Sequence, residues 1–355
     1  MTDIRKSSMR PMLLAVLIAT CAAPAAQAQA PYTRFDEAPQ VEAPSQAEQR
    51  AWTDWLQRSA AALAERVQPR DLALAAMLRS ATMMAGDALR DDDDAPSAAA
   101  PVDAQADAWR RSAADTAGGD ALANALLMAG GDAPLRLRAA QRWLGSDPEN
   151  LAPLLYRGGR VDTLLTDARG ARRFDLGMLE QVRWIQAALL RHPPTAAERA
   201  ALADGGDDIA DEHAATIAMS LWAAFPPPGL APMLQACTPD ALRGDAARLR
   251  DCRHIGTLMA DTADTQLGRM LGLDLLARTA ATAAERRDAQ SRQRTLDWQM
   301  LEWGRIAGSQ PRDGAAQLVR LLADPSIRSE VALVERVLQE AGMSPTPPAD
   351  WQPMR

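Results

Sequence analysis

The sequence predicts an all-α protein built as an array of antiparallel helical hairpins, with no substantial sheet. Apolar residues make up 47% of the 355-residue chain, which is enough to bury a large core. Aromatic residues contribute only 4%, so this core must consist mainly of Leu, Ala, Val and Met, a composition that favours helices over strands. Alternating runs of β-branched residues, the usual sign of strands, are absent from the sequence. We expect roughly twelve to sixteen helices, arranged as an open superhelix or as a closed, irregular bundle.

The N-terminal residues have the pattern of an export signal. Three basic residues precede an apolar run over 11–23, which is too short to span a bilayer comfortably. Ala26-Gln27-Ala28 then matches the A-x-A site of signal peptidase. The sequence therefore predicts a signal peptide over residues 1–28 and a mature protein that is periplasmic or secreted.

Cys21 leaves a second processing route open. Residues 17–21 (LIATC) are similar to a lipobox, in which the cysteine becomes acylated and anchors a lipoprotein to the membrane. Thr20 stands where such motifs have a smaller residue, so we favour simple cleavage after Ala28. No later segment reaches about 18 consecutive apolar residues, and no transmembrane helix is expected.

The charge of the chain argues against two classes of partner. The formal net charge is −7, and removal of residues 1–28 takes away one acidic and three basic residues, which leaves −9. Nucleic-acid binding needs a basic footprint, so nucleic acid is not expected as a main partner. The same balance gives no electrostatic attraction toward anionic lipid.

The N-terminal part of the mature chain divides into a tether, a hairpin and a linker. Residues 29–45 are Pro-rich and polar, as in tethers. Residues 46–87 have helical periodicity interrupted at Pro69, which predicts a helical hairpin. Residues 88–102 contain the run Asp91 to Asp94 and are interpreted as an acidic flexible linker. The apolar face predicted for the first helix consists of Trp52, Leu56, Leu63 and Val67.

Residues 103–342 form the predicted helical body. Glycine pairs and prolines separate its apolar periodic segments and are interpreted as helix terminators. The expected helices within the body include 122–128, 135–144, 151–156, 174–190 and 209–224.

Several helix ends in the body have recognisable caps. Thr195 and Glu198 have the spacing of a capping box. Thr238 precedes Pro239, which suits an N-cap followed by proline at the first helical position. Gly342 is predicted to terminate the last helix, after which residues 343–355 form a Pro-rich tail.

Cys237 and Cys252 are the only thiols left once the leader is removed. In an oxidising compartment an even number of cysteines predicts a disulfide. Closing a loop of about fifteen residues would stabilise the fold by roughly 3 kcal/mol. The alternative is a pair of buried free thiols. A zinc site is less favoured because His254 is near but no further ligand pair completes the set.

The sequence assigns no catalytic, cofactor-binding or metal-ligating residue. None of the three histidines lies in a metalloprotease motif, and no nucleophile elbow or phosphate-binding loop is present. His192 is interpreted as a helix C-terminal residue that complements the dipole. The acidic residues over 207–212, just before His213, would suit either a divalent cation or an acidic helix N-terminus, and we favour the second.

Tryptophans offer a weaker indication of a binding site. They could line a groove for a sugar or a peptide, but the more common role of such residues on amphipathic helices is to anchor the core. The residues concerned are Trp52, Trp55, Trp298 and Trp303.

One stretch resembles a known repeat family. Residues 138–150 (RAAQRWLGSDPEN) resemble the end of one tetratricopeptide unit and the start of the next, where a helix ends, an acidic-Pro-x-Asn turn follows and a new helix opens. The resemblance covers about a tenth of the chain, and the spacing of its proline breaks departs from the regular period of about 34 residues. It implies a degenerate helical-repeat protein. The whole pattern is also similar to uncharacterised secreted helical proteins of Gram-negative bacteria with such a turn and a late cysteine pair.

Two functions remain open from the sequence. The favoured hypothesis is a non-enzymatic binding or scaffold protein of the bacterial envelope, whose partner is another envelope protein or a peptide. The alternative is an all-α envelope enzyme, a glycan hydrolase or lyase, with an Asp/Glu acid–base pair. Convergent carboxyl groups in a deep pocket would favour the enzyme.

Overall fold

The computed structural model describes residues 45–88, 103–202, 209–309 and 311–353. These residues form seventeen α-helices and no strand, and their only β-type pairing is the isolated bridge between Asn150 and Arg173, so the all-α prediction is confirmed. The number of helices exceeds the expected twelve to sixteen because several are only one or two turns long. The helices are α2 Gln46–Glu65, α3 Pro69–Ala88, α4 Ala104–Thr116, α5 Ala121–Leu126, α6 Ala133–Ser146, α7 Leu151–Arg157, α8 Val161–Asp167, α9 Met178–Leu190, α10 Ala196–Leu202, α11 Ile209–Ala223, α12 Ala231–Ala236, α13 Pro239–Leu242, α14 Ala246–Thr262, α15 Gln266–Thr279, α16 Ala283–Ser309, α17 Pro311–Ala323 and α18 Glu330–Glu340.

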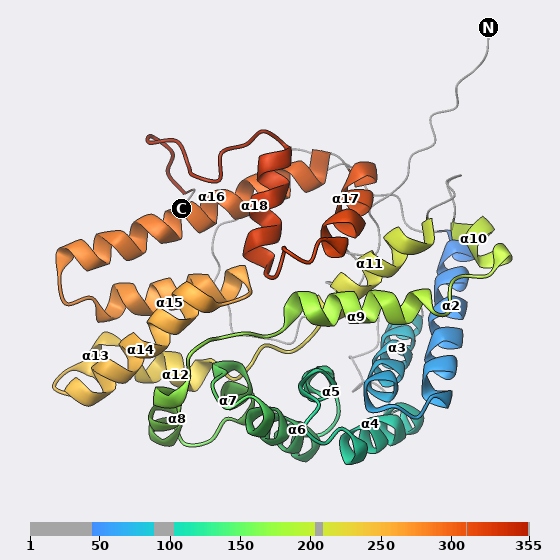
Figure 1. Cartoon of the computed structure of the whole chain (residues 1–355), viewed down its shortest axis with the longest axis horizontal. Coiled ribbons are helices and arrows are strands. Elements are labelled where there is room, and N and C mark those ends of the chain that lie inside the picture. The colour runs from blue at the N-terminus through green and yellow to red at the C-terminus, as the bar shows by residue number, and fades with distance from the viewer. Residues whose placement is uncertain (1–44, 89–102, 203–208, 310, 354–355) are drawn as a thin grey trace, which may run out of the picture.

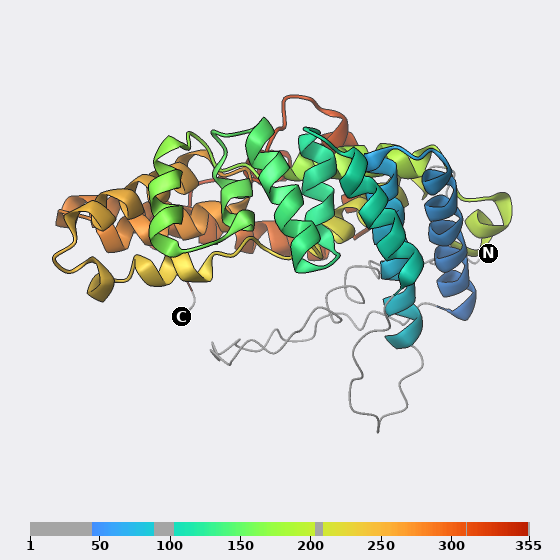
Figure 2. The ribbon, with the colours of Figure 1, turned by 90° about the horizontal axis from the view of Figure 1, so that it is seen from below.

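The first seven helices form an arc that α9 crosses. Figure 1 shows α2 to α8 following one another around one edge of the molecule, with α9 running across the inner side of the arc. Figure 2 shows the helices of the arc side by side in one row. Helices α12 to α16 extend the molecule beyond α8, and α17 and α18 lie on the other side of α9 (Figure 1). A single large apolar cluster connects the arc, α9, α11 and α14.

The N-terminal hairpin forms largely as the sequence predicts. Ser45 caps α2 through a capping box with Glu48, and Leu63 is buried on the inward face. Val67 was expected on the same face, and this expectation is wrong. It follows the end of α2, its φ is 54° and 62% of its surface is exposed. The helix cannot continue because Pro69 has no N–H and disfavours helical geometry at the residue before it.

Helix α9 begins later than its periodicity predicts. The apolar pattern starts at Phe174, but the helix starts at Met178 after Gly177, whose φ is 67°. The backbone N–H of Leu176 donates instead to the carboxylate of Asp264, 88 residues further along the chain. A long-range hydrogen bond therefore replaces the first helical turn.

The turn between α6 and α7 is organised by the side chain of Asn150. Helix α6 ends at Ser146, and Asn150 caps α7 by accepting a hydrogen bond from the backbone N–H of Ala152 at 3.1 Å. The side chain of Asn150 also donates to Asp147 and to the backbone oxygen of Asp175. Membership in the repeat family stays a prediction, because helices of the body range from 4 to 27 residues.

The predicted caps occur where expected, with one difference in chemistry. Thr195 and Glu198 form the reciprocal hydrogen bonds of a capping box. Thr238 precedes α13, but its hydroxyl donates to the backbone oxygen of Gln235 and does not cap the helix. Gly342 has a φ of 69° at the end of α18.

The Pro-rich segment after α18 lies against α16. The indole N–H of Trp298 donates to the backbone oxygen of Ser344 at 2.9 Å. Trp351 packs edge-on against Trp298, with ring centroids 5.4 Å apart, and lies beneath the guanidinium of Arg294. The segment after α18 therefore packs against α16.

Some predictions fall outside the described residues. They concern the signal peptide, the lipobox cysteine Cys21, the tether up to residue 44 and the acidic run within 89–102. Within the described ranges, no helix has the length and apolar character needed to cross a bilayer.

Candidate functional site: an arginine pocket

A pocket of about 250 Å³ lies where the α2–α3 turn, the start of α5 and the last turns of α9 meet. Three arginines, two aspartates and one tryptophan supply most of its wall. In Figure 1 this region lies at the end of the molecule occupied by α2, α3 and the C-terminal end of α9. The lining residues are Arg66, Gln68, Pro69, Arg70, Asp71, Asp120, Trp184 and Arg191.

The turn between α2 and α3 positions half of the pocket. Arg66 is the C-cap of α2, and Pro69 opens α3. Asp71 therefore falls in the first turn of α3, where a carboxylate complements the helix dipole. Its side chain is only 5% exposed. A carboxylate buried this deeply must be paired with cations and hydrogen-bond donors.

Asp71 pairs with two arginines, one through each carboxylate oxygen. Its Oδ2 accepts a hydrogen bond of 2.8 Å from Nε of Arg66, and its Oδ1 accepts one of 2.7 Å from a terminal nitrogen of Arg191. Arg191 is the C-cap of α9, 120 residues away in sequence. Asp71 thus fixes the positions of two guanidinium groups on separate elements.

The third arginine is held in the same manner. Nε of Arg70 donates to Oδ2 of Asp120 at 2.7 Å, and this hydrogen bond raises the pKa of Arg70 above its already high usual value. Oδ1 of Asp120 caps α5 by accepting from the backbone N–H of Ala123. Glu180 of α9 adds a further favourable charge interaction with Arg70.

Cations dominate the surroundings of the pocket. Burial lowers the pKa of His192, and the charges of Arg191, Arg66 and Arg58 lower it further. The lowered pKa of His192 weakens the dipole-complementing role predicted for it, and Arg191, the C-cap of α9, places a positive charge at the same helix end. The guanidinium of Arg191 also lies 5.9 Å from the ring centroid of Trp184.

The pocket differs in charge from the protein as a whole. Three arginines and two aspartates among its lining residues give a net charge of +1, whereas the chain carries −7. The Nε–H groups of Arg66 and Arg70 donate hydrogen bonds to the carboxylates of Asp71 and Asp120, respectively. The terminal nitrogens of both groups supply further donors suited to a planar anion.

Carboxyl groups meet elsewhere, in a buried connection between α9 and α14–α15. Asp264 accepts backbone N–H bonds from Leu176 and Met178 at 2.9 and 2.8 Å. Burial and the neighbouring charge of Asp175 raise the pKa of Asp264 to about 7. Each oxygen of Asp264 is already used to hold the start of α9, which is the arrangement of a structural tie. Neither aspartate lines the arginine pocket.

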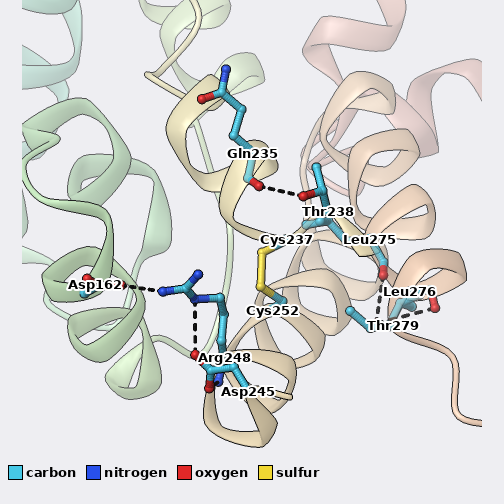
Figure 3. The surroundings of a disulfide bond; sticks show 10 residues. All are labelled: Asp162, Gln235, Cys237, Thr238, Asp245, Arg248, Cys252, Leu275, Leu276 and Thr279. Carbon is cyan, nitrogen blue, oxygen red and sulfur yellow. Dashed lines mark hydrogen bonds and ion pairs between the residues drawn. A yellow bond between two sulfur atoms is a disulfide. The ribbon is translucent and has the colours of Figure 1, made fainter. Parts of the chain in front are cut away.

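The cysteine prediction is confirmed. The sulfur atoms of Cys237 and Cys252 lie 2.01 Å apart, at bonding distance, and both residues are fully buried. Figure 3 shows the disulfide joining the end of α12 to α14, beside an ion pair from Arg248 to Asp162 of α8. His254 lies on the same helix as Cys252 and contacts the backbone oxygen of Ala168. The disulfide is therefore part of the core.

Other candidate residues contribute to side-chain packing or to a helix end. The side chain of His213 packs edge-on against Trp52, with ring centroids 4.6 Å apart. Asp211 and Glu212 lie in the first turn of α11, and positions 207 and 208 of the same acidic group lie outside the described residues. The described ranges contain no group of three or more His, Cys, Asp or Glu side chains placed to hold a metal ion.

The four tryptophans lie in two separate parts of the fold, on α2 and on α16. Trp55 is fully buried, and its indole N–H donates to the backbone oxygen of His192 at 2.7 Å. Trp298 is 9% exposed and donates a hydrogen bond to Ser344 in the segment after α18. Trp52 packs beside Trp55 on α2, whereas Trp303 lies on α16 with Trp298. They act as core anchors and do not form one groove.

Sequence reasoning missed the arginine pocket. Arg66, Arg70 and Arg191 flank prolines or helix ends, where arginine is common, and nothing in their spacing marks them as neighbours. The one local indication was the group Arg66 to Asp71, in which two arginines and an aspartate surround a proline that starts a helix.

Comparison of the chain with protein-family models, with curated proteins and with solved structures found no match.

Proposed function

We propose that the chain is a non-enzymatic binding protein of the bacterial envelope and that the arginine pocket is its site for another envelope protein or a peptide. The observation that carries the proposal is a cation-lined pocket with net charge +1 on an acidic protein. Such a pocket recognises an anionic group, and its two carboxylates, Asp71 and Asp120, are both paired with arginines.

Two features of the sequence support the compartment proposed for this function, the N-terminal pattern and the cysteine pair. The pattern over residues 1–28 supports export. The paired cysteines support an oxidising compartment, because disulfides persist in the periplasm and outside the cell. Anchoring through Cys21 would keep the same binding site in the same compartment.

The proposal is tested by affinity capture from an envelope extract of the bacterium that encodes the chain. Three exported proteins are compared: the natural chain, Arg70→Gln and Arg243→Gln. Arg243 is the matched control, because its ion pair with Asp240 joins side chains that are 79% and 86% exposed. It directly follows α13, which lies at the opposite end of the molecule (Figure 1).

We expect the natural chain and Arg243→Gln to retain the same partner and Arg70→Gln to lose it. Thermal unfolding of all three proteins must be similar, and Asp120 keeps its capping role without Arg70. Reproducible absence of a partner, or equal retention by Arg70→Gln, would contradict the proposed function.

A further inference from the structure

We infer that the arginine pocket binds a peptide carboxylate that has an apolar side chain beside it. This inference rests on the binding function proposed above and specifies the chemistry of the group that the site recognises. The carboxylate can belong to a chain end or to an acidic side chain, and the experiment below separates these two sources.

The arginines are held in place before any ligand arrives. Asp71, 5% exposed, fixes Arg66 and Arg191, and Asp120 fixes Arg70. The three arginine side chains nevertheless remain 52%, 36% and 40% exposed, respectively. A planar guanidinium with free terminal N–H groups matches the two oxygens of a carboxylate. Prior ordering of these side chains reduces the entropy that binding would otherwise cost.

The charge of the pocket favours a monoanion. The two internal aspartates neutralise two of the three arginines, which leaves +1 among the lining residues. A carboxylate balances this charge, whereas a phosphate group near neutral pH brings close to two negative charges beside Asp71 and Asp120. Repulsion from the internal aspartates therefore discriminates against phosphorylated ligands.

The size of the pocket fits one group and not a whole ligand. Its volume of about 250 Å³ lies just below the range of about 300–1,000 Å³ found for sites that enclose a drug-sized molecule. A peptide would place its carboxylate and one adjoining residue in the pocket, while the rest of the chain continues over the protein surface.

One apolar side chain, Trp184, lines the pocket, and a second, Val67, is adjacent in sequence to two lining residues. Trp184 lines the pocket and is half-buried, so its ring offers a face for an aliphatic group. Val67 lies between the lining residues Arg66 and Gln68 and is 62% exposed. Its φ of 54° is rare for a β-branched residue. Strained residues of this kind concentrate at binding sites.

The test uses isothermal titration calorimetry with three peptides of matched length. The first is acetyl-Gly-Ser-Gly-Leu-Val with a free C-terminal carboxylate, the second is its C-terminal amide, and the third is the amide with Asp in place of the second Gly. Each is titrated into the natural chain, Arg70→Gln, Arg70→Lys and Arg243→Gln. Inorganic phosphate is added as a competitor at the same ionic strength.

We expect the free acid to bind at least ten times more tightly than the amide. Arg70→Gln should weaken the free acid about tenfold, Arg70→Lys should restore only part of the loss, and Arg243→Gln should leave the affinity unchanged. Binding of the Asp-containing amide would identify an acidic side chain as a second source. Phosphate should compete weakly.

Two outcomes would overturn the inference. One is equal binding of the acid and the simple amide. The other is absence of binding by any peptide when affinity capture still depends on Arg70, and this result would leave the proposed binding function intact. If Arg70→Gln instead captures the partner as well as the natural chain does, the proposed function itself fails.

Discussion

The carboxylate of Asp264 accepts a hydrogen bond of 2.8 Å from the backbone N–H of Met178, the first residue of α9, across 86 positions of sequence. The other oxygen accepts from Leu176. These bonds attach the connection between α14 and α15 to the helix that crosses the arc. Because α9 also supplies Trp184 and Arg191, this tie helps to position one wall of the arginine pocket.

The first prediction concerns the pH dependence that Asp264 creates. Its pKa rises from about 3.8 to about 7 on folding, so between these values the folded chain binds more protons than the unfolded chain. Stability is therefore full at low pH and is lost as the pH rises through 7. We expect Asp264→Asn to show a smaller decrease in the free energy of unfolding between pH 5 and 8 in urea titrations.

The control for this measurement is Asp264→Ala, which removes both acceptors. It should destabilise the protein by about 3 kcal/mol even at pH 5, because two buried N–H groups lose their partners. Burial also raises the pKa of Glu330, which keeps a slope of the same sign in every variant. An unchanged slope in Asp264→Asn would show that Asp264 is ionised in the folded protein across this range.

The second prediction concerns His213 and has the opposite sign. Burial lowers the pKa of His213 from 6.5 to about 4. Between these pH values the unfolded chain binds a proton at His213 and the folded chain does not. Stability is lost as the pH falls from about 6.5 to about 4, by at most about 3 kcal/mol. His213→Phe keeps an aromatic ring against Trp52 and should remove most of this loss.

Denaturant titrations at pH 7.5, 6 and 5 check the histidine prediction. The lowered pKa of His192 contributes a decrease of the same sign, which His213→Phe should leave in place. If the variant and the natural chain lose equal stability between pH 7.5 and 5, His213 is not the group responsible.

The third prediction concerns the close approach of α14 and α15. A Cβ atom on Gly272 would lie 2.2 Å from the backbone nitrogen of Ala260 and 2.6 Å from the carbonyl carbon of Met259. Backbone cannot move aside as a side chain can, so Gly272→Ala should cost about 3 kcal/mol or more. The measurement is chemical denaturation.

Gly304 provides the matched control. It lies within α16 and is exposed, and a Cβ atom added to it would meet no neighbouring part of the fold within 4 Å. Gly304→Ala should stabilise the protein by about 0.5–1 kcal/mol, because alanine loses less backbone entropy in a helix. Similar effects of the two substitutions would contradict the close packing of α14 against α15.

The fourth prediction concerns the disulfide. The two cysteines are 15 residues apart, and loss of the cross-link should lower the free energy of unfolding by about 3 kcal/mol. The variant that carries Cys237→Ala and Cys252→Ala measures this loss, and reduction of the natural chain should give a comparable one. Thiol labelling of the denatured, exported protein should find no free cysteine, and two labelled thiols would refute the cross-link.

The fifth prediction concerns Val67. A left-handed conformation costs a residue with a Cβ about 1–2 kcal/mol, while glycine loses about 0.5–1 kcal/mol of additional backbone entropy on folding. Val67→Gly should therefore raise the free energy of unfolding by up to about 1 kcal/mol. Val319→Gly, within α17, should lower it. A marked loss of stability in Val67→Gly would mean that its side chain stabilises the turn.

Several local features were predictable from short stretches of sequence. The capping box of Thr195 and Glu198 and the terminator Gly342 were correctly placed. They depend on hydrogen bonds and dihedral preferences within a few residues, which neighbouring residues dictate. The pairing of Cys237 with Cys252 was predictable for a different reason, since the sequence beyond residue 28 contains no third cysteine.

The sequence predictions were wrong where contacts with other segments override the local helical preference of a stretch. The apolar pattern from Phe174 favoured a helix, but the backbone N–H of Leu176 donates to Asp264 and the helix begins only at Met178. The periodicity of α2 included Val67, but the turn demanded by Pro69 exposes it. Periodicity reports which face is apolar and contains no information about a partner 88 residues away.

The arginine pocket is the clearest product of tertiary structure. Arg70 meets Asp120 across 50 residues, and Asp71 meets Arg191 across 120. Each of these charges, taken alone in the sequence, is typical of a solvated helix end. The helical class and the caps follow from preferences within each segment, whereas the arginine pocket requires charges from several helices to converge, and that depends on how the whole core packs.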